Sequence, residues 1–265
     1  MTTPVLEVSG LSRFFGGLPA VRDVSMSVPA GERRLLLGPN GAGKTTFFNL
    51  IAGDFPPSEG EIRIFGQNVT GKSADQRTHL GMARTYQIIT LFPKNTLLHN
   101  VIISLVGLRK LRFNPWADLR RQAALWDEAR ATLALVGLDH LAERTVTETS
   151  YGERRRLEIA MALAQKPKLL LLDEPLAGLS ADERKDVQRL LQSIPRDVTI
   201  VMIEHDMDVA LAFADVITVM QHGQVVVEGS RADVVADPKT REGYLGHCRA
   251  HHQKSECVLR RVPRP

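Results

Sequence analysis

The feature that most constrains this chain is a glycine-rich octapeptide, G-P-N-G-A-G-K-T, at residues 38–45. It matches the pattern G-x-x-x-x-G-K-[ST], in which backbone N–H groups surround a phosphate. The segment 33–37 ends in an apolar run that predicts a buried strand before the loop, and residues 46–52 predict a helix that ends at Gly53. This order directs the positive end of the helix dipole at the anion. We therefore predict a nucleoside triphosphate site.

Individual residues of this loop have separate expected tasks. Gly41 and Gly43 permit the positive φ and the close backbone approach that side chains with a Cβ resist. Lys44 is expected to reach the β- and γ-phosphates, and the Thr45 hydroxyl to bind Mg²⁺. The residues predicted to hold the nucleotide here are Gly38, Pro39, Asn40, Gly41, Ala42, Gly43, Lys44, Thr45 and Thr46.

A second motif places two carboxylates after an apolar run. Four leucines at 169–172 precede Asp173 and Glu174. Such a run predicts a parallel strand buried on both faces, and ligands of open α/β sheets collect at the carboxyl ends of the strands. We predict that Asp173 holds Mg²⁺ and that Glu174 acts as general base on the attacking water. The alternative, two acids that merely begin a helix, is less favoured downstream of a phosphate loop.

The remaining pattern predicts an α/β fold with an insertion. Alternating apolar and polar residues at 5–8 and 21–28 are typical of half-buried strands. Between about 94 and 164 the periodicity becomes helical and strand signals stop, which predicts an inserted helical subdomain. We expect Trp116 and Trp126 to lie in the core of that insertion. The α/β alternation then resumes.

Composition separates the folded body from the end of the chain. The net charge of +4 comes from residues 247–265, which hold five basic residues and one glutamate, so residues 1–246 are neutral overall. The pI of 9.2 therefore describes a tail and not a basic face for nucleic acid. Both cysteines, Cys248 and Cys257, lie in this tail, where the spacing fits no zinc pattern. We expect an ATPase domain at 1–246 and a disordered basic tail at 247–265.

A third motif carries a family resemblance. Residues 149–153, T-S-Y-G-E, lead into a helical segment. This stretch resembles the signature of ATP-binding cassette (ABC) ATPases, usually written L-S-G-G-Q, because it keeps Ser150 and Gly152. The resemblance implies a P-loop ATPase core with an antiparallel β subdomain and a helical insertion. It also implies that Ser150 and Gly152 bind the nucleotide held by a second subunit.

The other marks of the ABC family occur in order along the chain. Gln87 stands at the Q-loop, where the family uses it in metal binding and catalysis, and His205 matches the switch histidine. Residues 175–180 match the D-loop, with Ser180 where an aspartate is common. Phe15 matches the aromatic side chain that stacks on adenine. The resemblance implies ATP and Mg²⁺ as cofactors and ATP hydrolysis as the activity.

The same resemblance implies a set of partners. These are two transmembrane permease subunits, a second cassette (the same chain or a homologue) and, indirectly, a periplasmic substrate-binding protein. No nucleic-acid partner is expected. No apolar run approaches the ~18 residues of a membrane span, and residues 1–4 lack a signal-peptide pattern. We therefore expect a cytosolic chain, attached peripherally to the cytoplasmic face of the inner membrane.

A narrower likeness concerns the transported substrate. Residues 15–21, 83–87, 91–92 and 244–246 resemble the ATPases of branched-chain amino-acid importers, and urea and amide importers use very similar subunits. Residues 152–156, G-E-R-R-R, also resemble the lipopolysaccharide-export ATPase, which remains an alternative.

Functions outside transport are less favoured. A cassette acting on DNA would need a long coiled coil, and one acting on ribosomes usually carries two cassettes in one chain. A regulator without hydrolysis would typically lack Glu174 or His205, and both are present.

The tail gives the first testable prediction. Removing residues 247–265 should leave ATP affinity and basal hydrolysis unchanged within about twofold, because the tail has few apolar residues to bury. Its basic groups should add attraction to anionic lipid of about 1 kcal/mol each near the surface. Co-sedimentation of full-length and truncated chains with anionic vesicles should differ at low salt and converge at high salt. Loss of ATPase activity on truncation would contradict the expected disorder.

Overall fold

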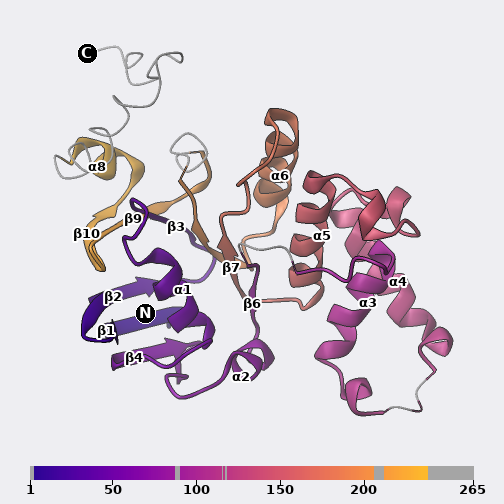
Figure 1. Ribbon diagram of the computed structural model, residues 1–265, viewed down its shortest axis with the longest axis horizontal. Coiled ribbons are helices and arrows are strands. Elements are labelled where there is room, and N and C mark those ends of the chain that lie inside the picture. Colours follow the sequence, from indigo (N-terminus) through magenta and orange to yellow (C-terminus); the bar gives the residue numbers. More distant parts are fainter. Residues whose placement is uncertain (1–2, 87–89, 115, 117, 206–211, 238–265) are drawn as a thin grey trace.

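The computed structural model describes residues 3–86, 90–114, 116, 118–205 and 212–237. Its α/β architecture, with two sheets and surrounding helices, confirms the predicted fold class (Figure 1). The predicted tail at 247–265 lies outside the described residues, and the boundaries expected for the domains remain predictions. Among the described residues, none of the helices combines the length and apolar character needed to cross a bilayer.

The elements follow one another from a β-rich amino-terminal part through a helical middle to a mixed carboxyl-terminal part. The strands are β1 (Leu6–Phe15), β2 (Leu18–Val28), β3 (Arg33–Leu37), β4 (Glu59–Ile64), β5 (Gln67–Asn68), β6 (Met82–Arg84), β7 (Leu169–Asp173), β8 (Thr199–Ile203), β9 (Val216–Gln221) and β10 (Gln224–Gly229). The α-helices are α1 (Lys44–Ala52), α2 (Ala74–His79), α3 (Leu97–Gly107), α4 (Ala123–Leu135), α5 (Tyr151–Ala164), α6 (Ala181–Ser193) and α8 (Arg231–Ala236). The short 3₁₀ helices among the described residues are η1 (Lys110–Phe113), η2 (Leu119–Arg121), η3 (Asp139–Leu141) and η4 (Val146–Glu148).

The larger sheet sets the position of the functional loops. Its strand order is β10-β9-β3-β8-β7-β6, with β9, β3, β8, β7 and β6 parallel and β10 antiparallel at one edge. Strand β3 therefore lies beside β8, and β8 beside β7. The carboxyl ends of these three neighbours carry the phosphate loop, His205 and Asp173, respectively. Strand order thus brings together residues that are up to 167 positions apart in sequence.

Both faces of this sheet are buried, which explains the continuous apolar runs. In β3, Leu36 packs with α1 and the smaller sheet, while Leu35 and Leu37 pack with the helical region. In β7, Leu169 and Leu171 pack in the core formed with α1 and the smaller sheet, while Leu170 and Leu172 pack in the core formed with the helical region. All of these leucines are fully buried. A strand with two buried faces cannot alternate apolar and polar residues.

The smaller sheet is antiparallel, in the order β2-β1-β4-β5, as the resemblance implied. Leu6 of β1 pairs with Val28 of β2 and with Ile64 of β4. The inner face of this sheet packs on Phe47 and Phe48 of α1, so the helix that follows the phosphate loop lies between the two sheets (Figure 1).

The helical region packs against the other face of the large sheet. Leu98 of α3, Leu133 of α4 and Leu157 of α5 share one core with the strand leucines. Trp126 of α4 is half-buried, and its Nε1–H donates to the Leu119 carbonyl over 2.8 Å. Its ring lies edge-on to the ring of His99.

The prediction that Trp116 is a core residue is wrong, because this side chain is 92% exposed. Trp116 falls between η1 and η2, outside any α-helix, so helical periodicity does not turn it inward. Its backbone N–H bonds locally to Asn114 Oδ1 over 3.1 Å.

One buried arginine fixes the end of α1. Arg77 of α2 is fully buried, and its Nη1 donates to the carbonyls of Leu50 and Ile51 over 2.6 and 2.7 Å. Burial lowers the pKa of Arg77 to about 10, with the Asp54 charge opposing the shift. The side chain therefore stays cationic at neutral pH and satisfies carbonyls that a helix end leaves open.

Replacing this guanidinium should destabilise the chain. Arg77→Met would leave several buried carbonyls unsatisfied, and we expect the free energy of unfolding to fall by about 3 kcal/mol. Urea unfolding followed by circular dichroism measures the change. Arg63→Met is the matched control, because Arg63 forms an exposed pair with Glu61 at 2.5 Å and its loss should change the free energy by less than about 0.5 kcal/mol. Equal effects of the two substitutions would refute the capping role of Arg77.

Candidate functional site

The phosphate loop opens on a cavity of about 350 Å³ at the carboxyl ends of β3, β7 and β8. Ala20 of β2 closes one side, and Glu174 and His205 close another. The cavity therefore combines most of the residues that the sequence singles out. Its lining consists of Ala20, Asn40, Gly41, Ala42, Gly43, Lys44, Thr45, Thr46, Glu174 and His205.

The glycines of the loop meet two different needs. A Cβ on Gly43, whose φ is +95°, would lie 2.3 Å from the Ala20 carbonyl oxygen, so only glycine fits against β2. Gly41 has φ +80°, but a Cβ there would meet nothing within 4 Å. Gly43 thus permits close packing of the phosphate loop against β2, while the space beside Gly41 is open for a ligand.

Helix α1 directs its amino terminus into this cavity. It begins at Lys44 after Gly43, which supplies no side-chain cap. The first N–H groups of a helix have no intrahelical acceptor, and with the helix dipole they favour an anion. Lys44 is 5% exposed, and its ammonium donates to the carbonyls of Gly38 and Pro39 over 2.6 and 3.1 Å. Burial lowers the pKa of Lys44, and the charges of Glu174 and Asp173 oppose this shift.

Glu174 and His205 are in direct contact across β7 and β8. Glu174 Oε1 lies 2.6 Å from His205 Nε2, so an ionised carboxylate would accept a hydrogen bond from the ring. The Glu174 backbone N–H donates to the Ile203 carbonyl over 3.1 Å. Its φ of +48° lies in the left-handed region, which costs a non-glycine residue roughly 1 kcal/mol. Such conformations are concentrated at functional sites.

Asp173 is a buried carboxylate with spare coordinating capacity. It is 1% exposed, and its Oδ2 accepts from Arg84 Nη2 over 3.1 Å. Its Oδ1 is buried without a hydrogen-bond partner among the residues that the structure describes. Burial raises the pKa of Asp173, while Arg84 opposes the rise. An unsatisfied carboxylate oxygen beside a phosphate loop fits Mg²⁺, which prefers oxygen ligands; Thr45 would supply a hydroxyl.

The residues of the signature motif lie apart from this cavity. Ser150 is the N-cap of α5, and its backbone N–H and Oγ form a capping box with Glu153. The Ser150 hydroxyl and the Gly152 N–H both point to the Glu183 carboxylate of α6. One chain therefore holds two separate groups of phosphate-type donors, at α1 and at α5.

The remaining residues predicted for the site are Phe15 and Gln87. Phe15, the last residue of β1, is 46% exposed and packs edge-on against Phe55 with 5.8 Å between ring centroids. An exposed ring is compatible with stacking on a base. Gln87 lies outside the described residues, so its predicted role stays a prediction.

Arg155 is a buried residue beside the site that the sequence did not single out. It is 1% exposed and donates to the carbonyls of Asp173 and Glu174 over 2.8 and 2.6 Å, and to that of Tyr86 over 3.0 Å. It thereby joins α5 to the backbone of Asp173 and Glu174 and to that of the residue before Gln87. Three successive arginines, 154–156, give no local signal for which one points inward.

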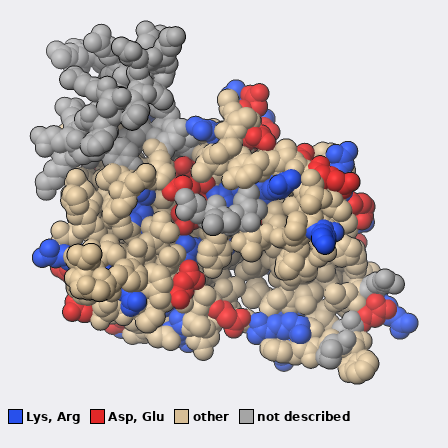
Figure 2. Space-filling view, viewed as in Figure 1, with Lys and Arg blue, Asp and Glu red and all other residues tan. Residues whose placement is uncertain are grey.

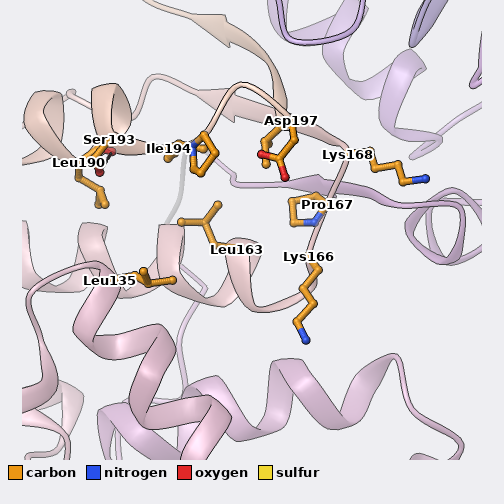
Figure 3. Close-up of a pocket in the computed structure, with 11 residues that line it drawn as sticks. Leu135, Leu163, Lys166, Pro167, Lys168, Leu190, Ser193, Ile194 and Asp197 are labelled. Carbon is orange, nitrogen blue, oxygen red and sulfur yellow. Dashed lines mark hydrogen bonds between the residues drawn. The ribbon is translucent and has the colours of Figure 1, made fainter.

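A second cavity, of about 540 Å³, does not belong to this site. It lies at Lys168 and Val198, which precede β7 and β8, and so at the amino ends of these strands. Figure 3 shows the side chains that line it. Leu163 points into its centre, and Leu135 and Leu190 flank it. This mostly aliphatic lining does not suit a polyphosphate.

Comparison with known proteins agrees with this geometry. Residues 21–177 match the family model described as ABC transporter. Among curated relatives, the high-affinity branched-chain amino acid transport ATP-binding protein BraF of Pseudomonas aeruginosa is 35% identical over 257 residues, covering 93% of this chain and 99% of the relative. A probable branched-chain amino acid transport ATP-binding protein, LivG of Archaeoglobus fulgidus, is 34% identical over 256 residues, covering 96% and 98%.

Solved structures show the same similarity. The ADP conformation of MJ1267, an ATP-binding cassette of an ABC transporter, superimposes with a TM-score of 0.82 at 31% identity, covering 92% of this chain and 100% of that one. The dimeric post-hydrolysis state of the cassette MJ0796, bound to ADP and Pi, gives a TM-score of 0.74 at 25% identity, covering 85% and 98%. The chain therefore belongs to the ABC transporter family, of which it is an ATP-hydrolysing cassette.

Proposed function

We propose that this chain powers a membrane importer of branched-chain amino acids or of related small amides or urea. The amino-acid assignment is supported by relatives named for branched-chain amino acid transport, which match over more than nine-tenths of the chain. The chain would bind two permease subunits at the cytoplasmic face of the inner membrane, and it would act with a periplasmic binding protein indirectly. On the face seen in Figure 2, acidic and basic residues are interspersed, so no single-sign field on that face suggests a nucleic-acid partner.

The observation that carries the catalytic proposal is the contact between Glu174 and His205 at the wall of the phosphate cavity. Glu174 would take a proton from the attacking water, while His205 orients that carboxylate and faces the γ-phosphate. Lys44 and the backbone N–H groups that begin α1 would hold the phosphates. Mg²⁺, held by Thr45, Asp173 and Gln87, would neutralise charge on the β- and γ-oxygens.

The composite site is the second part of the proposal. Two cassettes, identical or homologous, would bind two ATP molecules between the phosphate loop of one and the Ser150–Gly152 segment of the other. Phe15 would stack on the adenine. The separation of the two donor groups within one chain supports this arrangement, because Ser150 and Gly152 do not line the cavity of the phosphate loop. ATP would then favour the closed pair through its higher affinity for that state.

The catalytic base can be tested directly. Glu174→Gln should retain ATP binding and slow steady-state hydrolysis by ~10²–10⁴, the usual contribution of a general base. In cells, the same substitution should abolish uptake of labelled leucine, isoleucine or valine by the transporter that contains this chain. Glu143→Gln, in an exposed pair with Arg130, is the control and should keep wild-type rates. Unchanged ATP hydrolysis in Glu174→Gln would exclude Glu174 as the general base. Normal amino-acid uptake together with impaired urea uptake would instead identify urea as the transported substrate.

Action in trans can be tested by mixing two defective chains. Lys44→Ala removes the phosphate-loop ammonium, and Ser150→Arg blocks the opposite element. Each mixed dimer then keeps one intact composite site. We expect ATPase activity to recover partly on mixing, measured against either variant alone. Mixed dimers that form, as shown by cross-linking, yet stay inactive would contradict the composite site.

A further inference from the structure

The donors of the signature motif already hold an anion that belongs to the chain itself. Glu183 Oε1 accepts the Gly152 backbone N–H over 2.9 Å and the Ser150 hydroxyl over 3.2 Å. Glu183 lies in the first turn of α6, and Ser150 and Gly152 lie at the start of α5. A carboxylate therefore sits between the amino ends of two α-helices, where both helix dipoles favour negative charge.

The fit around this carboxylate is close. A Cβ on Gly152 would lie 2.6 Å from both Cγ and Oε1 of Glu183, so the contact requires glycine at this position. Beside it, a Cβ on Gly178 would lie 3.3 Å from the ring of Tyr151, so the segment before α6 also packs on α5. We call the contact of Glu183 with Ser150 and Gly152 the clasp.

The two oxygens of Glu183 have separate tasks. Oε2 accepts the backbone N–H and the hydroxyl of Ser180 over 3.0 and 2.7 Å and so completes the capping box of α6. Oε1 alone makes the clasp. The clasp can therefore open while α6 remains capped. Hydrogen bonds from Ser180, and then from Gly152 and Ser150, lower the pKa of Glu183, which keeps it ionised at neutral pH.

The donors of the signature motif are therefore already occupied by Glu183 before any nucleotide binds to them. If Ser150 and Gly152 bind the γ-phosphate of the partner subunit's nucleotide, as proposed above, the phosphate needs the same two donors that Glu183 occupies. Two anions cannot share one N–H and one O–H at hydrogen-bond distance without strong repulsion. One of them has to leave when the pair closes.

We propose that Glu183 is an internal competitor of the partner's γ-phosphate, so that the clasp holds the unpaired cassette in a state that resists closure. This inference rests on the proposed composite site. A nucleoside diphosphate lacks the third phosphate and would not displace the carboxylate. The clasp thus raises the nucleotide concentration needed for pairing and makes pairing depend on a triphosphate.

Glu183→Gln separates the clasp from the cap. Glutamine serves at the same position of a capping box in this chain, where Gln76 pairs with Ser73 at the start of α2. The substitution therefore removes the charge that competes with phosphate and keeps the cap of α6. Asp233→Asn is the matched control, because Asp233 caps α8 with Ser230 through the same box.

The experiment measures ATP-dependent pairing of the chain, with itself or with its cognate second cassette, by analytical ultracentrifugation. All samples carry Glu174→Gln to prevent turnover. Glu183→Gln should lower the ATP concentration for half-maximal pairing about three- to tenfold, as expected for the loss of charge-assisted bonds at a partly exposed site. Asp233→Asn should change it by less than about twofold. The same measurement is made with ADP. Glu183→Gln should reduce the difference between ATP and ADP in the concentration needed for half-maximal pairing.

The outcomes separate this inference from the proposed function. A purely structural role for Glu183 predicts that Glu183→Gln loosens α5 and raises the ATP requirement; an unchanged or raised requirement would overturn the clasp. The Ser150→Arg substitution in both subunits of the pair, measured in parallel, should abolish pairing because it blocks both composite sites. If Ser150→Arg pairs normally, the composite site itself is wrong, and the inference fails with it. If Ser150→Arg blocks pairing while Glu183→Gln behaves like the control, only the inference fails.

Discussion

Burial of both faces of the parallel sheet is the constraint on which the other features depend. Alternate leucines of β3 and β7 enter two different cores, one with α1 and one with the helical region. A one-residue shift in register would move every side chain of either strand into the opposite core. The strand order then fixes the carboxyl ends of β3, β8 and β7 beside one another. The phosphate loop, His205 and Asp173 lie close together because packing on both faces holds these three neighbouring strands in place.

Arg155 links the large sheet to α5 and to the residue before Gln87. Its guanidinium bonds to the backbone after β7 and to Tyr86, while its own helix begins at the signature motif. Helix α5 is therefore tied to the backbone of Asp173 and Glu174 by hydrogen bonds of 2.8 and 2.6 Å. One buried side chain thus joins the end of β7 to the helix that begins at the signature motif.

The chain also compensates its charged sites internally. Lys44 donates to carbonyls of its own loop, Arg84 pairs with Asp173, and Glu183 holds the signature donors. Each partner satisfies a buried or strongly polar group that would otherwise be costly. Ligand binding in such a site is an exchange of partners, so its free energy depends on what the unbound chain gives up as well as on the new contacts.

Local pattern was sufficient for part of this protein. The phosphate loop with its strand and helix, the buried run before Asp173 and the α/β class follow from sequence alone, because their signals lie within a few consecutive residues. The exposure of Trp116, the inward position of Arg155, the Arg84–Asp173 pair and the clasp of Glu183 on Gly152 required the tertiary structure. Each depends on which segments, 18 to 89 positions apart, come into contact, or on how a segment between helices is oriented. Neighbouring residues carry no record of such contacts, since packing of distant segments decides them.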